Sequence, residues 1–181
     1  MNIVLFGDSH LGRFGEKLIG QLESLVEGAT AYNCSAGGFT SSDGVKRVDF
    51  IAKLKPELVI FTFGGNDVTP WKQIVSKDIY LRNMRKIFEA FPESAKLMLL
   101  SPDVAVADPE QTREYNSLLH EYQTDLRPIC QELGVDVVEA SQVLASLNGD
   151  IHVEDGVHMN DQAYAKVIEA LAQAINSHLL Q

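Results

Sequence analysis

Cysteine is scarce in this sequence of 181 residues. The two cysteines, Cys34 and Cys130, fit neither a disulfide framework nor the Cys/His spacing of a zinc site, so we expect free thiols and no bound metal. Long apolar runs are absent, and the N-terminus lacks the basic region, apolar core and cleavage site of a secretory signal. These absences predict a cytoplasmic protein without a membrane partner.

Positive charge is also low, because 15 lysines and arginines face 25 aspartates and glutamates, for a formal net charge of −10. Such a chain repels phosphate groups, which argues against a nucleic acid or an anionic membrane surface as a partner. Its length and its 45% hydrophobic content suit one globular domain, and no linker or internal repeat interrupts it. We therefore predict a single domain over residues 1–181, with its oligomeric state left open.

Apolar runs and helical spacing alternate along the chain. The apolar runs predict five strands, at residues 3–6, 29–33, 58–63, 96–100 and 135–138. Helices are expected at residues 11–25, 45–54, 80–91, 115–133, 142–147 and 164–179, and Pro128 predicts a kink or break near Arg127. Because most of these strands are continuously apolar, we predict an α/β fold with three layers, in which helices cover both faces of a parallel sheet.

Four junctions between strands and helices contain glycines together with side chains that are common in active sites. They are Gly7-Asp8-Ser9, Gly37-Gly38, Gly64-Gly65-Asn66-Asp67 and, in the last long loop, Asp155-Gly156-Val157-His158. In a parallel sheet these junctions open on the same edge, where ligands bind. We therefore expect the four loops to converge. Taken alone, Ser9 is also a good helix N-cap and Asn66 a good turn residue.

The groups at these junctions fit acyl transfer. Ser9 supplies a nucleophile, His158 a base near neutral pH, and Asp155 a carboxylate that can orient the imidazole from three residues away. The backbone N–H groups of Ser9 and Gly38 and the side-chain amide of Asn66 can donate to an oxyanion. Two other histidines compete as the base: His10 is constrained beside Ser9, and His152 has no carboxylate three residues before it.

These residues resemble the blocks of the SGNH hydrolases, also called GDSL-type esterases and lipases. Gly7-Asp8-Ser9-His10 looks like the first block, Asn33–Ser41 the second, Gly64–Asp67 the third and Asp155–His158 the last. The resemblance implies a flavodoxin-like sheet of order 2-1-3-4-5 and a catalytic triad of Ser9, Asp155 and His158. It also implies an oxyanion hole of Ser9, Gly38 and Asn66, and no cofactor.

The sequence departs from the family pattern at two positions. His10 stands where leucine is commonest, and Phe39 stands where the second block usually has an acidic or small polar residue. Gly37 is therefore an alternative to Gly38 in the oxyanion hole. For Asp8 we expect a structural role, with its carboxylate accepting N–H bonds within the turn.

Short linking loops without a lid favour an ester hydrolase for short acyl groups such as acetyl, carried by a small molecule or a carbohydrate. The alternative is a lysophospholipase or thioesterase for longer chains. In that case an apolar groove is expected at the predicted substrate-binding residues Val68, Trp71 and Val157, with Val104 and Met159. A non-catalytic flavodoxin-like receiver or binding module is a further alternative, because Asp8 and Asp67 end neighbouring strands. However, the fifth strand is not followed by the lysine that a receiver needs.

Overall fold

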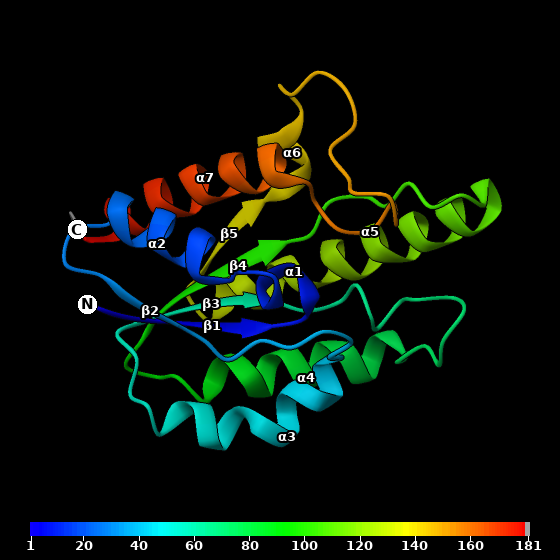
Figure 1. Ribbon diagram of the computed structural model, residues 1–181. Helices are drawn as coiled ribbons and strands as arrows, with labels where there is room; N and C mark the ends of the chain where they lie inside the picture. Colours follow the sequence, from blue (N-terminus) through cyan, green and yellow to red (C-terminus); the bar gives the residue numbers. More distant parts are fainter. Residues whose placement is uncertain (180–181) are drawn as a thin grey trace.

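The computed structural model describes residues 1–179, so residues 180 and 181 of the predicted domain lie outside the described part. Five parallel strands form one sheet in the order β2-β1-β3-β4-β5 (Figure 1). They are β1 (Asn2–Gly7), β2 (Thr30–Asn33), β3 (Leu58–Thr62), β4 (Ala95–Leu100) and β5 (Val135–Glu139). The predicted α/β class and strand order are both confirmed.

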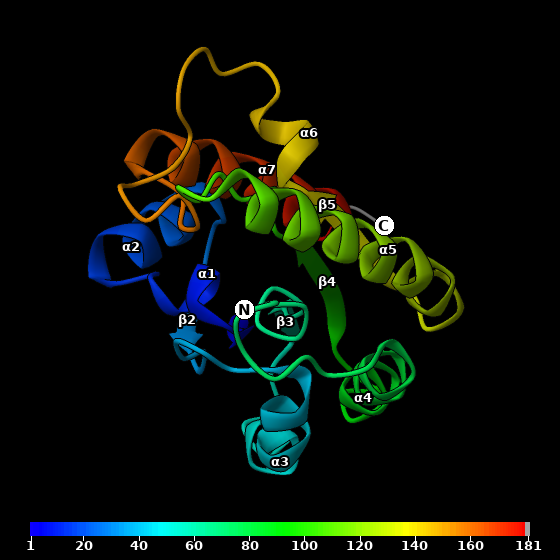
Figure 2. The same cartoon turned by 90° about the vertical axis from the view of Figure 1, so that its right-hand side faces the viewer.

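Helices lie on both faces of the sheet (Figure 2). One face packs against α1 (Ser9–Gly12), α2 (Glu16–Leu25), α6 (Ala140–Leu144) and α7 (Asp161–Leu179). The other face packs against α3 (Ser41–Ala52), α4 (Lys77–Glu89) and α5 (Pro109–Glu132). Alternate residues of the central strands enter the two cores, as the pleat of a strand requires: Ile3 and Leu5 face α2 and α7, whereas Val4 and Phe6 face α3 and α4.

The first predicted helix is two helices in the structure. We expected one helix over residues 11–25, but the chain turns between α1 and α2, and residues 13–15 are not helical. The side chain of Asn33, at the end of β2, donates to the carbonyl oxygens of Leu11 (2.8 Å) and Phe14 (3.0 Å). The last carbonyl groups of a helix lack N–H partners within it, and the Asn33 side chain supplies donors for these two. The break therefore depends on a contact between residues about twenty positions apart.

Of the predicted kink or break near Arg127, the break is wrong, because α5 continues through Pro128 to Glu132. Proline removes one backbone hydrogen bond from a helix and clashes with the preceding turn. Leu126 and Cys130, on either side of Pro128, are both buried against the sheet. We infer that this packing holds the two halves of α5 in one helix.

Two glycines let the site loops pack closely. A Cβ on Gly7, the last residue of β1, would lie 2.2 Å from the carbonyl oxygen of Thr62 on the neighbouring β3. Gly156 has a φ of +65°, and a Cβ there would lie 2.2 Å from the carbonyl oxygen of Ala105. The N–H of Ala105 in turn donates to the carbonyl of Gly156 over 2.7 Å. The loop that contains His158 is therefore fixed against the loop that follows β4.

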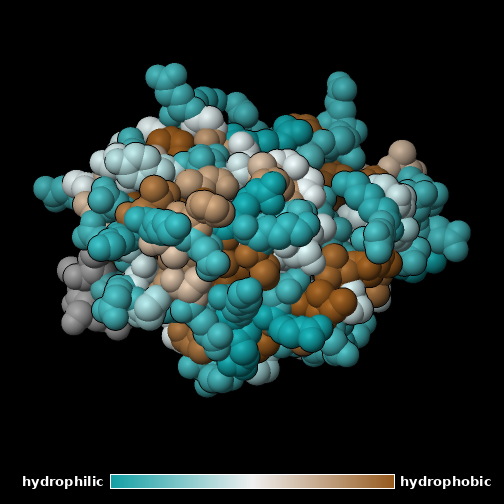
Figure 3. All heavy atoms as spheres, turned by 90° about the horizontal axis from the view of Figure 1, so that it is seen from below, coloured by the Kyte–Doolittle hydropathy of each residue, from teal (hydrophilic) through white to brown (hydrophobic). Residues whose placement is uncertain are grey.

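The surface mixes polar and apolar side chains. The face seen from below, beneath α3 and α4, is mostly hydrophilic, with separate apolar patches (Figure 3). Within residues 1–179, no helix is both long and apolar enough to cross a membrane. The thiols of Cys34 and Cys130 are both free, as expected.

Candidate active site

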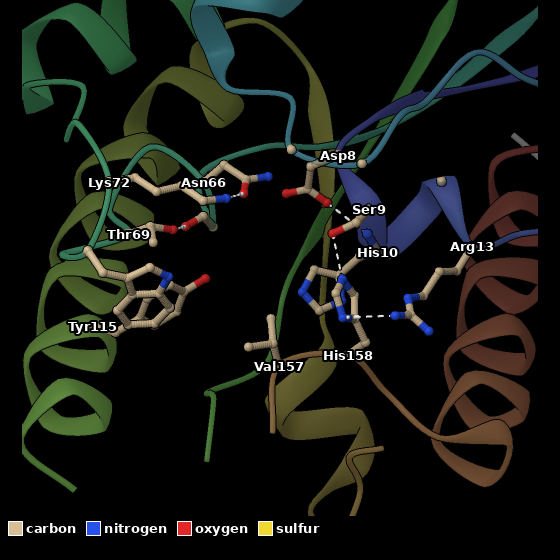
Figure 4. A pocket seen from close by; sticks show the side chains of 15 residues that line it. Asp8, Ser9, His10, Arg13, Asn66, Thr69, Lys72, Tyr115, Val157 and His158 are labelled. Carbon is tan, nitrogen blue, oxygen red and sulfur yellow. Dashed lines mark hydrogen bonds between the residues drawn. The ribbon is translucent and has the colours of Figure 1, made fainter. Parts of the chain in front are cut away.

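The four loops predicted to converge do meet, at the carboxyl edge of the sheet. They surround an open pocket of about 460 Å³ (Figure 4). Residues from the first, second, third and last sequence blocks all contribute to its walls, and α5 adds an aromatic side chain. The lining consists of Asp8, Ser9, His10, Gly12, Arg13, Gly37, Gly38, Gly65, Asn66, Thr69, Trp71, Lys72, Tyr115, Val157 and His158.

Ser9 is the first residue of the one-turn helix α1, and Asp8 alone separates it from β1. Asp8, and not Ser9, is the N-cap of this helix, because its carboxylate accepts the backbone N–H of His10 over 2.9 Å. Asp8 thus has the structural role that we expected. The hydroxyl of Ser9 is consequently free for another partner, and its backbone N–H lies at a helix N-terminus, where donors lack partners within the helix.

Ser9, His158 and Asp155 form a continuous hydrogen-bonded chain. His158 Nε2 lies 2.7 Å from Ser9 Oγ, and His158 Nδ1 lies 2.6 Å from Asp155 Oδ2. The other oxygen of Asp155 accepts the backbone N–H groups of Val157 (2.8 Å) and His158 (2.9 Å). Partial burial acts to raise the pKa of Asp155, but these hydrogen bonds outweigh it and lower the pKa to about 2. The carboxylate is therefore ionised and held in one orientation beside the imidazole.

The predicted oxyanion donors Ser9, Gly38 and Asn66 all line the same pocket as His158. Gly38 has a φ of +80°, a conformation that favours glycine, and both Gly37 and Gly38 line the pocket. The side-chain nitrogen of Asn66 donates to the carbonyl of Phe39 over 3.0 Å. Since a carboxamide has two N–H groups, one stays available to a ligand.

Asp67 ties two of the site loops together. Both of its carboxylate oxygens accept the backbone N–H of Ser41 at 3.0 Å, and one of them also accepts the Ser41 hydroxyl. Ser41 is the first residue of α3, directly after the loop that contains Gly38. The third sequence block therefore holds the second block in place. Burial raises the pKa of Asp67 to about 6, against the opposing effect of the Ser41 hydrogen bonds.

The carboxyl of Asp8 has an unusually high proton affinity. Burial and the nearby Asp67 carboxylate raise its pKa from 3.8 to about 7, against the opposing effect of the hydrogen bond from His10. A carboxyl with a raised pKa in the folded state stabilises the fold fully below its unfolded pKa. That contribution is lost as the pH rises through the folded pKa. For Asp8 the loss falls between about pH 4 and pH 7.

Replacing Asp8 with asparagine should therefore weaken the pH dependence of stability. Asparagine keeps an oxygen that accepts the His10 N–H but cannot ionise. We expect the decrease in Tm from pH 5 to pH 8 to be smaller in Asp8→Asn than in the wild type by a few degrees, measured by thermal melting. Asp49→Asn, on the exposed face of α3, is the matched control. Equal pH dependence in the two variants would contradict this interpretation of Asp8.

Two basic residues of the pocket were not singled out by the sequence. Arg13 Nη2 lies 3.1 Å from His158 Nδ1 and 3.6 Å from Asp155 Oδ2. Lys72 Nζ lies 3.3 Å from Asn66 Oδ1, which orients the carboxamide so that its nitrogen serves as the donor. Arg13 follows Ser9 by four residues, one helical turn, and this spacing is a signal that the sequence contained. Nothing local marks Lys72, which reaches Asn66 through the irregular stretch after β3.

The structure divides the predicted substrate-binding residues into two groups. Trp71 and Val157 line the pocket, and the Trp71 ring stacks on Tyr115 at 5.9 Å between centroids. Val68 is a wrong prediction: it is 0% exposed and packs in the core beneath α4, because a turn from Gly64 directs it inward. Val104 and Met159, 3% and 1% exposed, are buried as well.

His152, the alternative base, and the two aspartates that suggested a receiver are all engaged in hydrogen bonds within the protein. His152 is held away from Ser9, with Nε2 at 2.8 Å from the Asp103 carbonyl and Nδ1 at 3.2 Å from Asp150. Asp8 and Asp67, which suggested a receiver, have carboxylates that accept backbone N–H groups. Among residues 1–179, no three His, Cys, Asp or Glu side chains group together in a way that would hold a metal ion.

Comparison with known proteins agrees with this fold and shows the family of the chain. The family model of the GDSL-like lipase/acylhydrolases matches residues 5–166. The GDSL esterase/lipase CPRD49 of Arabidopsis thaliana is 29% identical, over 88% of this chain and 73% of its own length. A lipase/acylhydrolase from Enterococcus faecalis has a TM-score of 0.82 at 19% identity, covering 98% of this chain and 96% of that one.

A catalytic mutant of an acetylxylan esterase from Geobacillus stearothermophilus is also similar in fold. Its TM-score is 0.76 at 21% identity, over 96% of this chain and 93% of its own. An open parallel sheet whose carboxyl edge holds a serine, a histidine and an aspartate in hydrogen-bond contact is the architecture of a serine hydrolase. The chain belongs to the GDSL-like lipase/acylhydrolase family, the SGNH hydrolases, and is a carboxylic ester hydrolase. The family resemblance of the sequence is thereby confirmed.

Proposed function

We propose that the protein hydrolyses short-chain acyl esters, acetyl esters in particular, through an acyl-enzyme on Ser9. The observation that supports this most is the hydrogen-bonded chain from Ser9 Oγ through His158 to Asp155, at 2.7 Å and 2.6 Å. In this arrangement the ring nitrogen that faces the serine has a free lone pair, because Nδ1 donates its proton to the carboxylate. His158 can then accept the Ser9 proton as Oγ attacks the ester carbonyl carbon.

The attack converts the carbonyl oxygen into an oxyanion, which needs donors that are already in position. In this proposal they are the N–H of Ser9, the N–H of Gly38 and the free N–H of Asn66. Lys72, on the oxygen of the Asn66 amide, keeps that nitrogen directed to the pocket. The removal of one such donor typically lowers kcat by about 10²- to 10³-fold.

The tetrahedral intermediate breaks down when the bond between the carbonyl carbon and the alcohol oxygen cleaves. His158 Nε2 gives its proton to that oxygen, and the alcohol leaves with the acyl group bound to Ser9. Water then repeats the sequence: His158 accepts its proton, the water oxygen attacks the acyl carbon, and Ser9 leaves with the proton restored. The products are a carboxylic acid and an alcohol, and the enzyme is regenerated.

The shape of the pocket favours a short acyl group. A longer apolar groove was expected to include Val68, Val104 and Met159, but these three side chains belong to the core. The apolar lining that is left consists of Trp71, Tyr115 and Val157, among polar residues. The similarity in fold to an acetylxylan esterase supports the same acyl length and allows for a carbohydrate as the alcohol. Cytoplasmic location remains a prediction from the sequence.

A series of 4-nitrophenyl esters from acetyl to palmitoyl tests this function. We expect kcat/KM to be highest for acetyl or propionyl and to decrease steadily toward octanoyl, because a longer chain has no buried surface to occupy. Release of 4-nitrophenol gives the rates. A maximum at eight carbons or longer would instead favour a lysophospholipase or thioesterase, and an absence of hydrolysis across the series would contradict the proposed function itself.

A further inference from the structure

His10 is a buried polar side chain in the wall of the pocket. It is 2% exposed, it follows Ser9 directly, and its ring centroid lies 5.7 Å from that of His158. Figure 4 shows it beside Ser9 and His158, on the side of the pocket opposite Lys72. A buried imidazole costs free energy unless its nitrogens are hydrogen-bonded. His10 stands where leucine is commonest in the GDSL-like family. A leucine side chain has no polar atom, so its burial leaves no hydrogen bond unmade.

The hydrogen bonds of His10 within residues 1–179 involve its backbone and not its ring. Its N–H donates to Asp8 over 2.9 Å, and its carbonyl accepts the Tyr164 hydroxyl over 3.0 Å. The ring nitrogen Nδ1 is buried and has no hydrogen-bond partner within residues 1–179. The residue is therefore held in place by its main chain while its side chain has unused hydrogen-bonding capacity beside the nucleophile.

The imidazole of His10 is neutral in any assay near neutral pH. Burial, together with the neighbouring His158, His152 and Arg13, lowers its pKa to about 3, against an opposing effect of Asp155. A neutral imidazole has one N–H donor and one acceptor nitrogen. Among buried backbone groups, an N–H without an acceptor is rarer than a carbonyl without a donor, and we extend this order to the imidazole nitrogens. The unpartnered Nδ1 therefore bears the lone pair, and Nε2 bears the proton.

We propose that this N–H of His10 binds an oxygen atom in the alcohol half of the substrate, close to the ester bond. The proposal rests on the proposed function. His158 must reach the leaving alcohol oxygen to protonate it, and His10 lies beside His158. An oxygen two carbons beyond the ester oxygen, as in an acylated diol, ether or sugar, then lies next to the His10 ring. His10 thus selects alcohols that have a neighbouring oxygen over alkyl alcohols.

A pair of acetates with the same number of heavy atoms tests this selection. 2-Methoxyethyl acetate has an ether oxygen where butyl acetate has a methylene group, and released acetic acid can be titrated for both. The ratio of their kcat/KM values is measured in the wild type, in His10→Leu and in His10→Phe, which keeps a ring. Division of the wild-type ratio by the variant ratio cancels the intrinsic reactivity of the two esters. We expect a quotient of about 3 to 10 for both variants, the range of one neutral hydrogen bond.

Two controls locate the effect. Lys72→Met removes a polar group from the opposite wall and should keep the wild-type ratio, whatever it does to the rates. 4-Nitrophenyl methoxyacetate and butyrate move the ether oxygen to the acyl half, and here the quotient should stay near 1. A quotient within twofold of 1 on the acetate pair for both His10 variants, or a larger quotient on the acyl pair, would overturn the proposal. Absence of hydrolysis of every ester by the wild type would contradict the proposed function as a whole.

Discussion

Ser9→Ala is expected to lower kcat on 4-nitrophenyl acetate by about 10⁴- to 10⁶-fold, which is the range found when a hydrolase loses its nucleophile. Alanine removes the oxygen that forms the acyl-enzyme but leaves the backbone N–H and the other oxyanion donors in place. The fold should be preserved, because Asp8 and not Ser9 caps α1. The melting temperature of the variant should therefore stay within a few degrees of the wild type.

Labelling with a fluorophosphonate provides a measurement that is independent of turnover. Mass spectrometry should find the adduct on the peptide that contains Ser9 and on no other serine. Ser24→Ala is the matched control, because Ser24 is an exposed serine of α2 that bonds only the carbonyl of Gln21. The control should keep full activity and full labelling. Undiminished turnover by a folded Ser9→Ala would show that another group is the nucleophile.

The fold was predictable because its central strands are almost continuously apolar. Residues 58–63 of the sequence are buried on both faces once β3 is in the middle of the sheet. Such continuously apolar strands are typical of a parallel sheet that is covered by helices on both faces. The errors occurred where distant contacts decide the local structure. Asn33 ends α1 from the far end of β2, and the packing of Leu126 and Cys130 keeps α5 continuous through Pro128.

The site was predictable to the extent that its groups follow strand ends. The rule that parallel strands open on one edge is enough to bring Ser9 and Asn66 together. His158 lies beyond α6 in the loop before α7, and the rule alone does not place it. The rule gives no information on which way a loop side chain points, and so Val68 was placed in the pocket although its turn directs it into the core. It also gives no distances, and for this reason the contacts of Lys72 with Asn66 and of Asp67 with Ser41 appear only in three dimensions.

Asp155→Asn is expected to lower kcat by about 10³- to 10⁴-fold while the loop keeps its shape. The asparagine oxygen can still accept the N–H groups of Val157 and His158. Its amide nitrogen, however, would replace the oxygen that lies 2.6 Å from His158 Nδ1 and would donate to that nitrogen. The ring proton would then move to Nε2, which faces Ser9, and the serine would have no base. Arg13, 3.1 Å from the same Nδ1, would reinforce this wrong tautomer as a second donor.

The chain contains a close control for this variant in the same loop. Asp150 accepts the backbone N–H of His152 over 2.9 Å and lies 3.2 Å from its ring, much as Asp155 does with His158. Asp150→Asn therefore changes an equivalent aspartate–histidine contact that has no link to Ser9, and it should keep kcat within about twofold. Similar losses in the two variants would indicate that both aspartates act on the loop structure. A large loss in Asp155→Asn alone indicates that the carboxylate acts on His158, through its tautomer and through the charge that stabilises the imidazolium, because both substitutions preserve the backbone contacts of the loop.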